Sequence, residues 1–369
     1  MIPVNRPLLG GNEKKYLIEC IETGWVSSEG PFVRKLEAGF AKLMGCAHGV
    51  AVCNGSVAIE VALAALHIGP GDEVIVPSFT IISCAAAIVR VGAIPVVVDC
   101  QSDTWNIDPA LIAAKITHRT KAIMVVHIYG LPVDMDPVIA LARKHGLFIV
   151  EDAAEQHGQT YKGRPIGSLG DIATVSFYPN KQITTGEGGM VVTNDDALAE
   201  RCRALRNLCF DKERRYIHDE LGWNFRMSNI QAAVGVAQLE RIEQTLAKKR
   251  LIGEWYQTYL RGNSLLQLPL DHTDYAENIY WVFGVVLDNR IPFDASGAMA
   301  RLKVKGVDTR HFFWPLHEQP VFRNKGWFAN EHCPVSERIA RRGFYLPSGV
   351  GLTEEEAHKS ADALLGILQ

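Results

Sequence analysis

The chain has 369 residues, of which 47% are hydrophobic and 21% charged, and its formal net charge at pH 7 is -3. This length allows about two domains with a large core, and the small net charge gives no reason to expect nucleic acid or an anionic membrane as a partner. The eight cysteines form no C-x-x-C pair, so they indicate neither a metal site nor a disulfide framework. Without a signal-peptide pattern or an apolar run of membrane-span length, a cytoplasmic enzyme is expected.

The chain begins with helical patterns at residues 12–23 and about 32–44, which flank a loop at 24–31. The glycines, serines and proline of this loop are typical of a turn-rich segment. Trp25 and Ser27 lie in it and are candidate ligand contacts. A tryptophan that only pins the loop to the body of the protein is the commoner case for Trp25.

A strand at 49–53 is followed by a turn at Gly55 and an apolar helix that runs to residue 65. The free amides and the positive dipole end of a helix N-terminus bind phosphate, and Ser56 would add a hydroxyl group. The alternative is that Asn54 or Ser56 only caps the helix. This junction therefore predicts a phosphate site only if other parts of the chain support it.

Strands and helices then alternate, which predicts a parallel or mixed sheet covered on both faces. Strands are expected at 73–77, 94–99, 122–126 and 147–150, with helices between them at 81–91, 109–116 and 136–144. Ligands of such sheets bind at the carboxyl ends of the strands. Asp152 and Glu155 follow one strand end, where a carboxylate is costly unless it has a cationic partner. Capping of a following helix is the alternative role.

A single lysine, Lys181, lies between an apolar strand at 172–177 and a glycine-rich turn at 186–189. Partial desolvation there would lower the pKa of the amine and make it a nucleophile that forms a Schiff base with a carbonyl compound. The alternative is a surface lysine at a strand end.

These signals together fit pyridoxal phosphate, which needs a lysine for its aldehyde, an acid for its ring nitrogen and a helix N-terminus for its phosphate. Lys181 and Asp152 supply the first two parts. The turn at Gly55 and Ser56, with Ser176, supplies the third.

Five segments resemble the nucleotide-sugar aminotransferases of the DegT/DnrJ type, and they occur in the same order over nearly the whole chain. They are residues 69–77, 126–130, 151–154, 176–189 and 224–233. Within that family, residues 24–30, 180–186 and 309–317 are most similar to GDP-perosamine synthases.

The resemblance implies a role for each matching residue. Lys181 matches the lysine that binds the cofactor aldehyde, Asp152 the partner of its ring nitrogen, and Glu155 the residue that reaches its ring hydroxyl. Matches to the remaining cofactor contacts are Gly55, Ser56, the amide of Val57, Ser176, and Ile81, where relatives usually carry a stacked aromatic residue.

Asn224 matches an asparagine that relatives lend to the cofactor phosphate of the neighbouring subunit, which implies a homodimer with shared active sites. His317 and the loop at residues 25–28 match segments near the sugar. Arg310 is a candidate for recognition of substrate charge, with a structural ion pair as the alternative.

The resemblance also implies an α/β, aspartate-aminotransferase-like (type I) fold with a large mixed-sheet domain at 1–245 and a smaller α+β domain at 246–369. A long helical stretch at about 228–259 is expected to bridge them. A strand at 281–287 and a helix at 353–367 follow.

The implied reaction transfers an amino group from L-glutamate to the C4 ketone of a nucleotide-linked 4-keto-6-deoxyhexose. GDP-4-keto-6-deoxy-D-mannose, giving GDP-perosamine for surface polysaccharides such as O-antigen, is the expected substrate. The alternatives are a UDP- or dTDP-linked keto-sugar aminated at C4 or C3, sugar deoxygenation, and a regulatory protein. Relatives that deoxygenate sugars have lost the lysine, and regulatory relatives usually bring a DNA-binding segment that is not visible here.

Overall fold

A seven-stranded mixed sheet forms the larger part of the computed structural model, which describes residues 1–211 and 213–368. Its strand order is β1-β9-β8-β5-β4-β2-β3, and β9 runs antiparallel to both of its neighbours while the other pairs are parallel. The strands are β1 (His48–Val52), β2 (Glu73–Pro77), β3 (Ile94–Val98), β4 (Thr120–Val126), β5 (Phe148–Asp152), β8 (Ile172–Ser176) and β9 (Gly189–Thr193). The predicted α/β sheet is confirmed.

Helices cover both faces of this sheet because successive strand side chains point to opposite sides. In β2, Val74 and Val76 pack into one hydrophobic cluster and Ile75 into the other. The first cluster includes α3 (Gly55–Ala65), α4 (Ile82–Arg90) and α7 (Asp196–Arg206). The second includes α2 (Pro31–Leu43), α5 (Pro109–Ile112), α6 (Met135–His145) and α8 (Asn229–Leu239).

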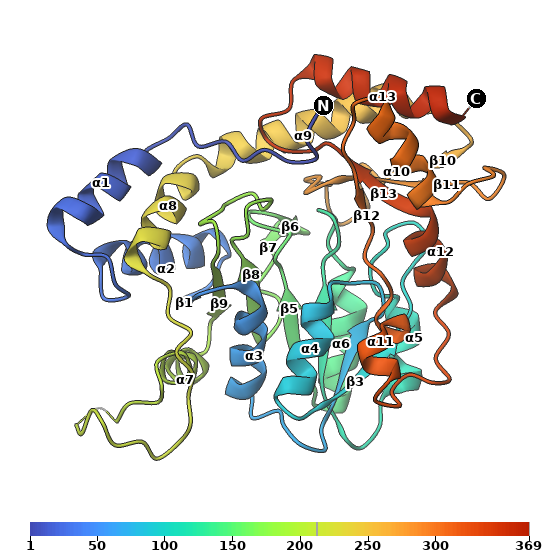
Figure 1. Ribbon diagram of the computed structural model, residues 1–369. Helices are drawn as coiled ribbons and strands as arrows, with labels where there is room; N and C mark the ends of the chain where they lie inside the picture. Colours follow the sequence, from blue (N-terminus) through green and yellow to red (C-terminus); the bar gives the residue numbers. More distant parts are fainter. Residues whose placement is uncertain (212, 369) are drawn as a thin grey trace.

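A smaller antiparallel sheet with the order β10-β11-β13-β12 is built from the C-terminal part of the chain (Figure 1). Its strands are β10 (Leu266–Gln267), β11 (Phe283–Leu287), β12 (Arg310–His311) and β13 (Gly343–Leu346). α9 (Ile242–Leu260), α10 (Ala295–Val304) and α13 (Glu354–Leu368) pack against it around Tyr256, Phe283 and Phe344. The predicted division of the chain at residue 245 stays a prediction, and α9 runs through that position.

The remaining elements are short or lie at the edges. They are α1 (Glu13–Thr23), the 3-10 turn η1 (Ala113–Lys115), the hairpin β6 (Thr160–Tyr161) and β7 (Arg164–Pro165), the 3-10 turn η2 (Leu316–Glu318), α11 (Pro320–Arg323) and α12 (Pro334–Arg342).

The helical stretch expected at about 228–259 is confirmed, but it consists of two helices, α8 and α9, which meet at Glu240 and Arg241. Glu240 accepts hydrogen bonds there from Asn12 and Tyr16, which ties the junction to the start of the chain. α8 packs against α1 and α2, whereas α9 packs against α13. The chain therefore bends where it passes from one core to the other, and apolar spacing alone does not reveal such a bend.

Two segments without regular structure extend along or away from the body. Residues 207–211 and 213–225 belong to an arm beside α7 that leaves the body of the molecule (Figure 1). At the N-terminus, Val4 accepts a hydrogen bond from the amide of Ser348, and Asn5 donates one to the carbonyl of Pro179. The N-terminal segment thus joins the smaller sheet to the loop that carries Lys181.

In the part of the chain that the structure describes, no helix combines the length and apolar character needed to cross a membrane.

Candidate active site

A cavity of about 620 Å³ lies at the carboxyl ends of the central strands of the large sheet. This is the edge at which sheets of this kind bind ligands. The predicted residues that line it are Gly55, Ser56, Val57, Ile81, Asp152, Glu155, Ser176 and Lys181. The fold therefore brings together residues that are separated by more than 120 positions in the sequence.

Lys181 lies in the loop after β8, and its side chain is only 10% exposed. Its Nζ atom is 3.5 Å from Glu155 Oε1 and 3.8 Å from the centroid of the Trp281 ring. Burial lowers the pKa of the Lys181 amine, while the carboxyl groups of Glu155 and Asp152 oppose this shift. A lowered pKa increases the fraction of neutral amine, which is the nucleophilic form.

Asp152 is the last residue of β5 and is buried. Its Oδ1 accepts a hydrogen bond from the amide of Ala154 at 3.1 Å, and its Oδ2 accepts one from Cys84 Sγ at 3.3 Å. Burial raises the pKa of the Asp152 carboxyl, and these two donors with Lys181 counteract only part of that effect. A cationic ligand group beside Asp152 would complete the stabilisation of its ionised form.

Glu155 is also buried, and its Oε2 accepts a hydrogen bond from the amide of Tyr129 at 2.7 Å. Burial raises the pKa of the Glu155 carboxyl to about 7, against the opposing effect of Lys181. The cavity thus contains one amine whose pKa is lowered and two carboxyls whose pKa values are raised. Such pairs of shifted groups are common at catalytic sites.

The N-terminus of α3 forms another wall of the cavity. Asn54 caps this helix, since its Oδ1 accepts a hydrogen bond from the amide of Val57 at 3.0 Å. The Val57 amide that was predicted to bind phosphate is therefore already engaged in the cap, and its phosphate role stays a prediction. Ser56 Oγ lies 2.8 Å from Ser83 Oγ, a hydroxyl that the sequence reasoning missed.

Gly55 allows this helix to approach β8 closely. A Cβ atom at Gly55 would lie 2.6 Å from Cβ of Ser176, so any larger residue would push the two elements apart. The close approach places the first turn of α3 and the Ser176 hydroxyl on one side of the cavity. Amides of a first helical turn have no acceptor within the helix, so this corner suits an anion.

An aromatic wall from the C-terminal part of the chain closes the cavity, and the sequence reasoning missed it. Trp281, Phe313 and Tyr345 line it together with Tyr178. The Trp281 indole nitrogen donates to the carbonyl of Asn180 at 2.8 Å, which fixes the ring next to Lys181. Tyr178 and Phe313 fall within the segments 176–189 and 309–317 that carry the resemblance, but no role was assigned to them, and Trp281 and Tyr345 lie outside every segment that carries it.

Some predicted residues lie away from the cavity of their own subunit. The carbonyl oxygens of Trp25 and Ser27 accept hydrogen bonds from the side chain and the amide of Asn229, and Trp25 is 50% exposed. Asn224 belongs to the arm, where its Oδ1 accepts a hydrogen bond from Arg226. The predicted ligand roles of Trp25, Ser27 and Asn224 stay predictions.

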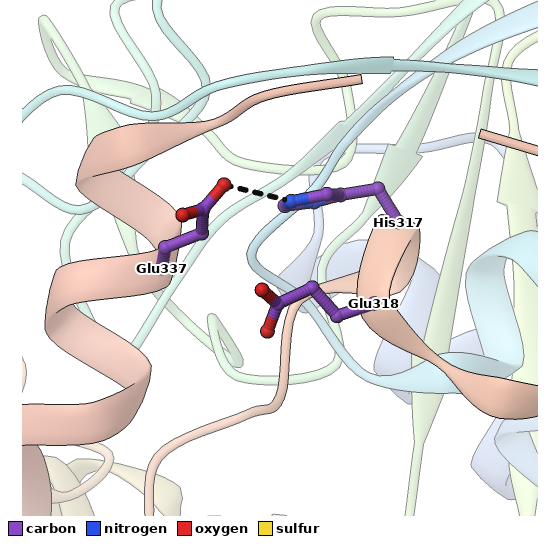
Figure 2. Close-up of side chains that lie close together, drawn as sticks. All are labelled: His317, Glu318 and Glu337. Atoms are coloured by element: carbon purple, nitrogen blue, oxygen red, sulfur yellow. Dashed lines mark hydrogen bonds and ion pairs between the residues drawn. The ribbon is translucent and has the colours of Figure 1, made fainter. Parts of the chain in front are cut away.

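His317 is buried and does not line the cavity. Its Nδ1 is 2.7 Å from Ser78 Oγ, and its Nε2 is 3.1 Å from Glu337 Oε1 (Figure 2). Glu318 lies close enough for the three residues to hold a metal ion, but Glu318 pairs with Arg341 and both nitrogens of His317 are hydrogen-bonded. The contacts of His317 connect η2 to the end of β2 and to α12, and its predicted contact with the sugar stays a prediction.

Arg310 is exposed on β12 and lines a second, smaller cavity of about 210 Å³. Four residues line both this side cavity and the main one. They are Tyr178, Asn180, Trp281 and Tyr345.

The main cavity fits pyridoxal phosphate in both its size and its chemistry. Lys181 is a buried amine for the aldehyde, Asp152 is a buried carboxyl for the ring nitrogen, and the corner at Gly55 and Ser56 is a cradle for the phosphate. A lysine, a buried acid and an anion site around one cavity define a pyridoxal-phosphate-dependent aminotransferase.

Comparison with known proteins agrees with this class. The model of the DegT/DnrJ/EryC1/StrS aminotransferase family matches residues 7–365, so the chain belongs to that family. It is a pyridoxal-phosphate-dependent sugar aminotransferase.

The individual relatives are similar over nearly their whole length. The chain is 43% identical over 369 residues to GDP-perosamine synthase of Caulobacter vibrioides, covering 100% of this chain and 98% of that protein. It is 42% identical to GDP-perosamine synthase of Escherichia coli O157:H7, covering 96% and 95%. The crystal structure of an aminotransferase from Psychrobacter cryohalolentis superimposes with a TM-score of 0.92 at 31% identity, covering 98% and 97%.

Proposed function

We propose that this enzyme transfers the amino group of L-glutamate to the C4 ketone of GDP-4-keto-6-deoxy-D-mannose and forms GDP-perosamine for a surface polysaccharide such as O-antigen. The observation that carries the amino transfer is the buried Lys181 between Glu155 and Trp281. Similarity to two GDP-perosamine synthases over nearly the whole chain supports the choice of sugar.

Lys181 performs the proton transfers in this proposal. Pyridoxal phosphate supplies an aldehyde that binds amines and a ring that accepts the electrons of a broken C–H bond. With a lowered pKa, Lys181 Nζ takes the proton from Cα of glutamate in the first half-reaction. In the second half-reaction the amino nitrogen carried by the cofactor would replace the ketone oxygen, which leaves as water, and Lys181 Nζ would give the proton that forms the new C4–H bond of the sugar.

Asp152 and Glu155 would set the protonation states of the groups in the site. Asp152 would hold the cofactor's ring nitrogen in its protonated form, and that positive charge would keep the buried carboxyl of Asp152 ionised. Glu155 lies beside Lys181 and is fixed by the Tyr129 amide, so it can hold a proton near the lysine amine. The aromatic wall excludes water from this side of the site.

The test is turnover with a small panel of GDP-, UDP- and dTDP-linked keto-sugars, with glutamate as donor. Amination of the GDP-linked 4-keto-6-deoxymannose at C4 with at least about 10-fold higher kcat/KM than the other sugars supports the proposal, since such a ratio exceeds the smallest pocket effects. Lys181→Ala serves as the inactive control. Preference for a UDP- or dTDP-linked sugar, or amination at C3, would overturn the choice of substrate.

We also propose a homodimer whose two active sites each receive Asn224 from the partner subunit. Three large apolar side chains on the arm are exposed, namely Tyr216 at 82%, Ile217 at 46% and Leu221 at 90%. Exposed apolar surface of this kind is common at protein interfaces. Lys212, in the same stretch of sequence, lies outside the described residues.

Subunit complementation tests the dimer. Lys181→Ala is mixed with a variant inactivated at Asn224, and the subunits are allowed to exchange. If Asn224 acts in the partner's site, one site of each mixed dimer carries both changes and the other carries neither, so activity returns to a fraction of wild type. If exchange is verified and no activity returns, Asn224 does not act across the interface.

A cytoplasmic location is part of the proposal as well. All eight cysteines are free, and six of them are buried. Structural disulfides are rare in reducing compartments, so a chain with eight unpaired cysteines is typical of the cytoplasm.

A further inference from the structure

Cys84 contacts the carboxyl group of Asp152 from inside the protein. It lies in the first turn of α4 and is fully buried, and its Sγ is 3.3 Å from Asp152 Oδ2. Asp152 lines the main cavity and Cys84 does not, so the thiol reaches the carboxyl group from behind the cavity wall. No step of the proposed function uses this thiol.

The direction of this hydrogen bond follows from the chemistry of the two groups. An ionised carboxyl group has no proton to give, so the Cys84 S–H group donates and Asp152 accepts. Burial, together with the charge of Asp152, raises the pKa of the Cys84 thiol well above its usual value, so the thiol keeps its proton. Sγ also lies 3.6 Å from Thr80 Oγ1. Because the single thiol proton is already used, the Thr80 hydroxyl donates to Sγ, which leaves the thiol proton directed at Asp152.

Asp152 accepts hydrogen bonds on both of its carboxyl oxygens. The amide of Ala154 donates to Oδ1 at 3.1 Å, and Cys84 donates to Oδ2. Donors on two different oxygens fix the plane of the carboxyl group. They also favour its ionised form, which burial opposes. A carboxylate that accepts two hydrogen bonds still has free lone pairs, so a ring nitrogen can donate to it as well.

Two other buried thiols show that this placement is not a general feature of the core. Cys46 Sγ lies 3.1 Å from the carbonyl oxygen of Gly167, and Cys100 Sγ lies 3.4 Å from Ser336 Oγ. Both partners are neutral, and neither cysteine lines the main cavity. Of these three thiols, only that of Cys84 meets a buried carboxyl group in the wall of the active site.

We propose that Cys84 is a positioning residue for the amino transfer, whose thiol keeps Asp152 ionised and aimed at the ring nitrogen of the cofactor. This inference rests on the role of Asp152 in the proposed function. Without the thiol, the proton between Asp152 and the ring nitrogen would lie more on the carboxyl group, and the ring would draw electrons less strongly from the Cα–H bond. The alternative is a packing contact that has no effect on the ring nitrogen.

Four variants distinguish a hydrogen-bond donor from a side chain that only fills space. Cys84→Ala and Cys84→Val both remove the donor, and valine also fills the space of the sulfur atom. Cys84→Ser keeps an O–H donor at the same position. Cys202→Ala is the matched control, because Cys202 is an equally buried cysteine on α7 that does not line the main cavity.

The first measurement needs no reaction. Protein freed of its cofactor is titrated with 4′-deoxypyridoxine phosphate, which cannot bond covalently to Lys181, and with the analogue in which carbon replaces the ring nitrogen. Binding is followed by tryptophan fluorescence, since Trp281 lines the cavity. Cys84→Ala and Cys84→Val should bind the nitrogen-containing probe about 3- to 10-fold more weakly than wild type, the range for loss of one hydrogen bond. They should bind the carbon analogue as wild type does, and Cys84→Ser and Cys202→Ala should bind both probes as wild type does.

The second measurement shows whether Cys84 acts through Asp152. In cofactor-loaded protein, the rate of the glutamate half-reaction should fall about 3- to 10-fold in Cys84→Ala and Cys84→Val and stay within about twofold of wild type in Cys84→Ser. In protein that already carries Asp152→Asn, the same changes at Cys84 should lower the rate by less than about twofold. The group that the thiol positions is then absent, so the two effects do not add.

The outcomes separate this inference from the proposed function. A loss confined to the nitrogen-containing probe and restored by serine supports the role of Cys84. Equal weakening of both probes, weakening of neither, or an undiminished loss of rate in protein that carries Asp152→Asn would overturn that role and leave the role of Asp152 standing. Full turnover by Asp152→Asn alone would refute the role of Asp152 in the proposed function, and the inference with it.

Discussion

The two walls of the active site differ in how they are built. One wall lies at the carboxyl edge of the large sheet, where Asp152 ends β5 and Lys181 follows β8. The other is the aromatic wall, in which Trp281, Phe313 and Tyr345 come from the C-terminal part of the chain. In the proposed function, the first wall would supply the groups that exchange protons, and the second would shape the cavity and exclude water.

This difference shows which part of a site a sequence reveals. A charged residue at or shortly after the end of a buried strand is costly unless it has a partner of opposite charge. Asp152 and Lys181 therefore stand out in the sequence. A tryptophan in a C-terminal segment is ordinary core material, and only the folded chain places Trp281 at 3.8 Å from the Lys181 amine. We expect changes in the first wall to affect the chemistry and changes in the second to affect affinity and stability.

The largest effect is expected from Lys181→Ala. Without this amine the site loses the base proposed to take the Cα proton of the donor, so turnover should fall by at least about 1,000-fold, within the range for loss of a positioned general base. Borohydride reduction of the wild type should bleach its visible absorbance and fix the cofactor on Lys181, as peptide mapping can show. An adduct on another lysine would refute the assignment.

A smaller loss, on the order of 100-fold in kcat, is expected for Asp152→Asn, the size typical of removing one preorganised electrostatic partner. The neutral amide keeps the shape of Asp152 but no longer holds a proton on the ring nitrogen. Stability should change little, because the asparagine oxygen still accepts from the amide of Ala154, and its NH2 group can donate to the sulfur of Cys84, which is a weak acceptor. Near-normal turnover would show that Asp152 is only a structural acceptor.

The large sheet could be predicted from the sequence better than the C-terminal part of the chain. The sequence predicts six of the seven strands of the large sheet, all but β9, to within a few residues, because near-continuous apolar strands between helices have few other solutions. The bend between α8 and α9 and the burial of His317 could not be predicted, since both depend on contacts with distant segments. The smaller sheet has strands of only two to five residues, which give a weak local pattern.

Glu155→Gln should change how stability depends on pH in protein from which the cofactor has been removed. The pKa of Glu155 is raised to about 7 by burial, so this group contributes stability that is complete below the ordinary carboxyl pKa and is lost as the pH rises through 7. Glutamine does not titrate and lacks this loss. At pH 8 the variant should therefore gain on the order of 1–3 kcal/mol relative to wild type, measured by urea unfolding at pH 5 and pH 8.

One result would refute the expected pH dependence. If the stability of the wild type and of Glu155→Gln fell in parallel between pH 5 and pH 8, the Glu155 carboxyl would not have a raised pKa. Ionising the buried Glu155 would then cost the folded protein no free energy of unfolding.

The smallest effect is expected behind the aromatic wall, at Lys249. This lysine of α9 is buried, and its Nζ donates hydrogen bonds to the carbonyls of Trp281 at 2.7 Å and Ser348 at 2.6 Å. It thereby holds the residue whose ring contacts Lys181. Lys249→Met keeps the length of the side chain but leaves both carbonyls without this donor, so we expect a loss of about 1–2 kcal/mol at pH 9.

The pH dependence of that loss distinguishes Lys249 from an ordinary buried contact. Burial, with a further contribution from the charge of Lys181, lowers the pKa of the Lys249 amine to about 7. The folded protein therefore binds this proton less tightly than the unfolded chain does, and the stability that Lys249 contributes grows as the pH rises from 7 towards 10. The difference in the free energy of unfolding between wild type and Lys249→Met, measured with urea, should therefore widen over the same pH range. The control is Arg250→Met, a change at the exposed neighbour, whose free energy of unfolding should stay within about 0.5 kcal/mol of wild type at every pH. If the difference in the free energy of unfolding narrowed as the pH rose, Lys249 would be charged in the folded protein. The carbonyl of Trp281 would then accept its hydrogen bond from an ammonium group.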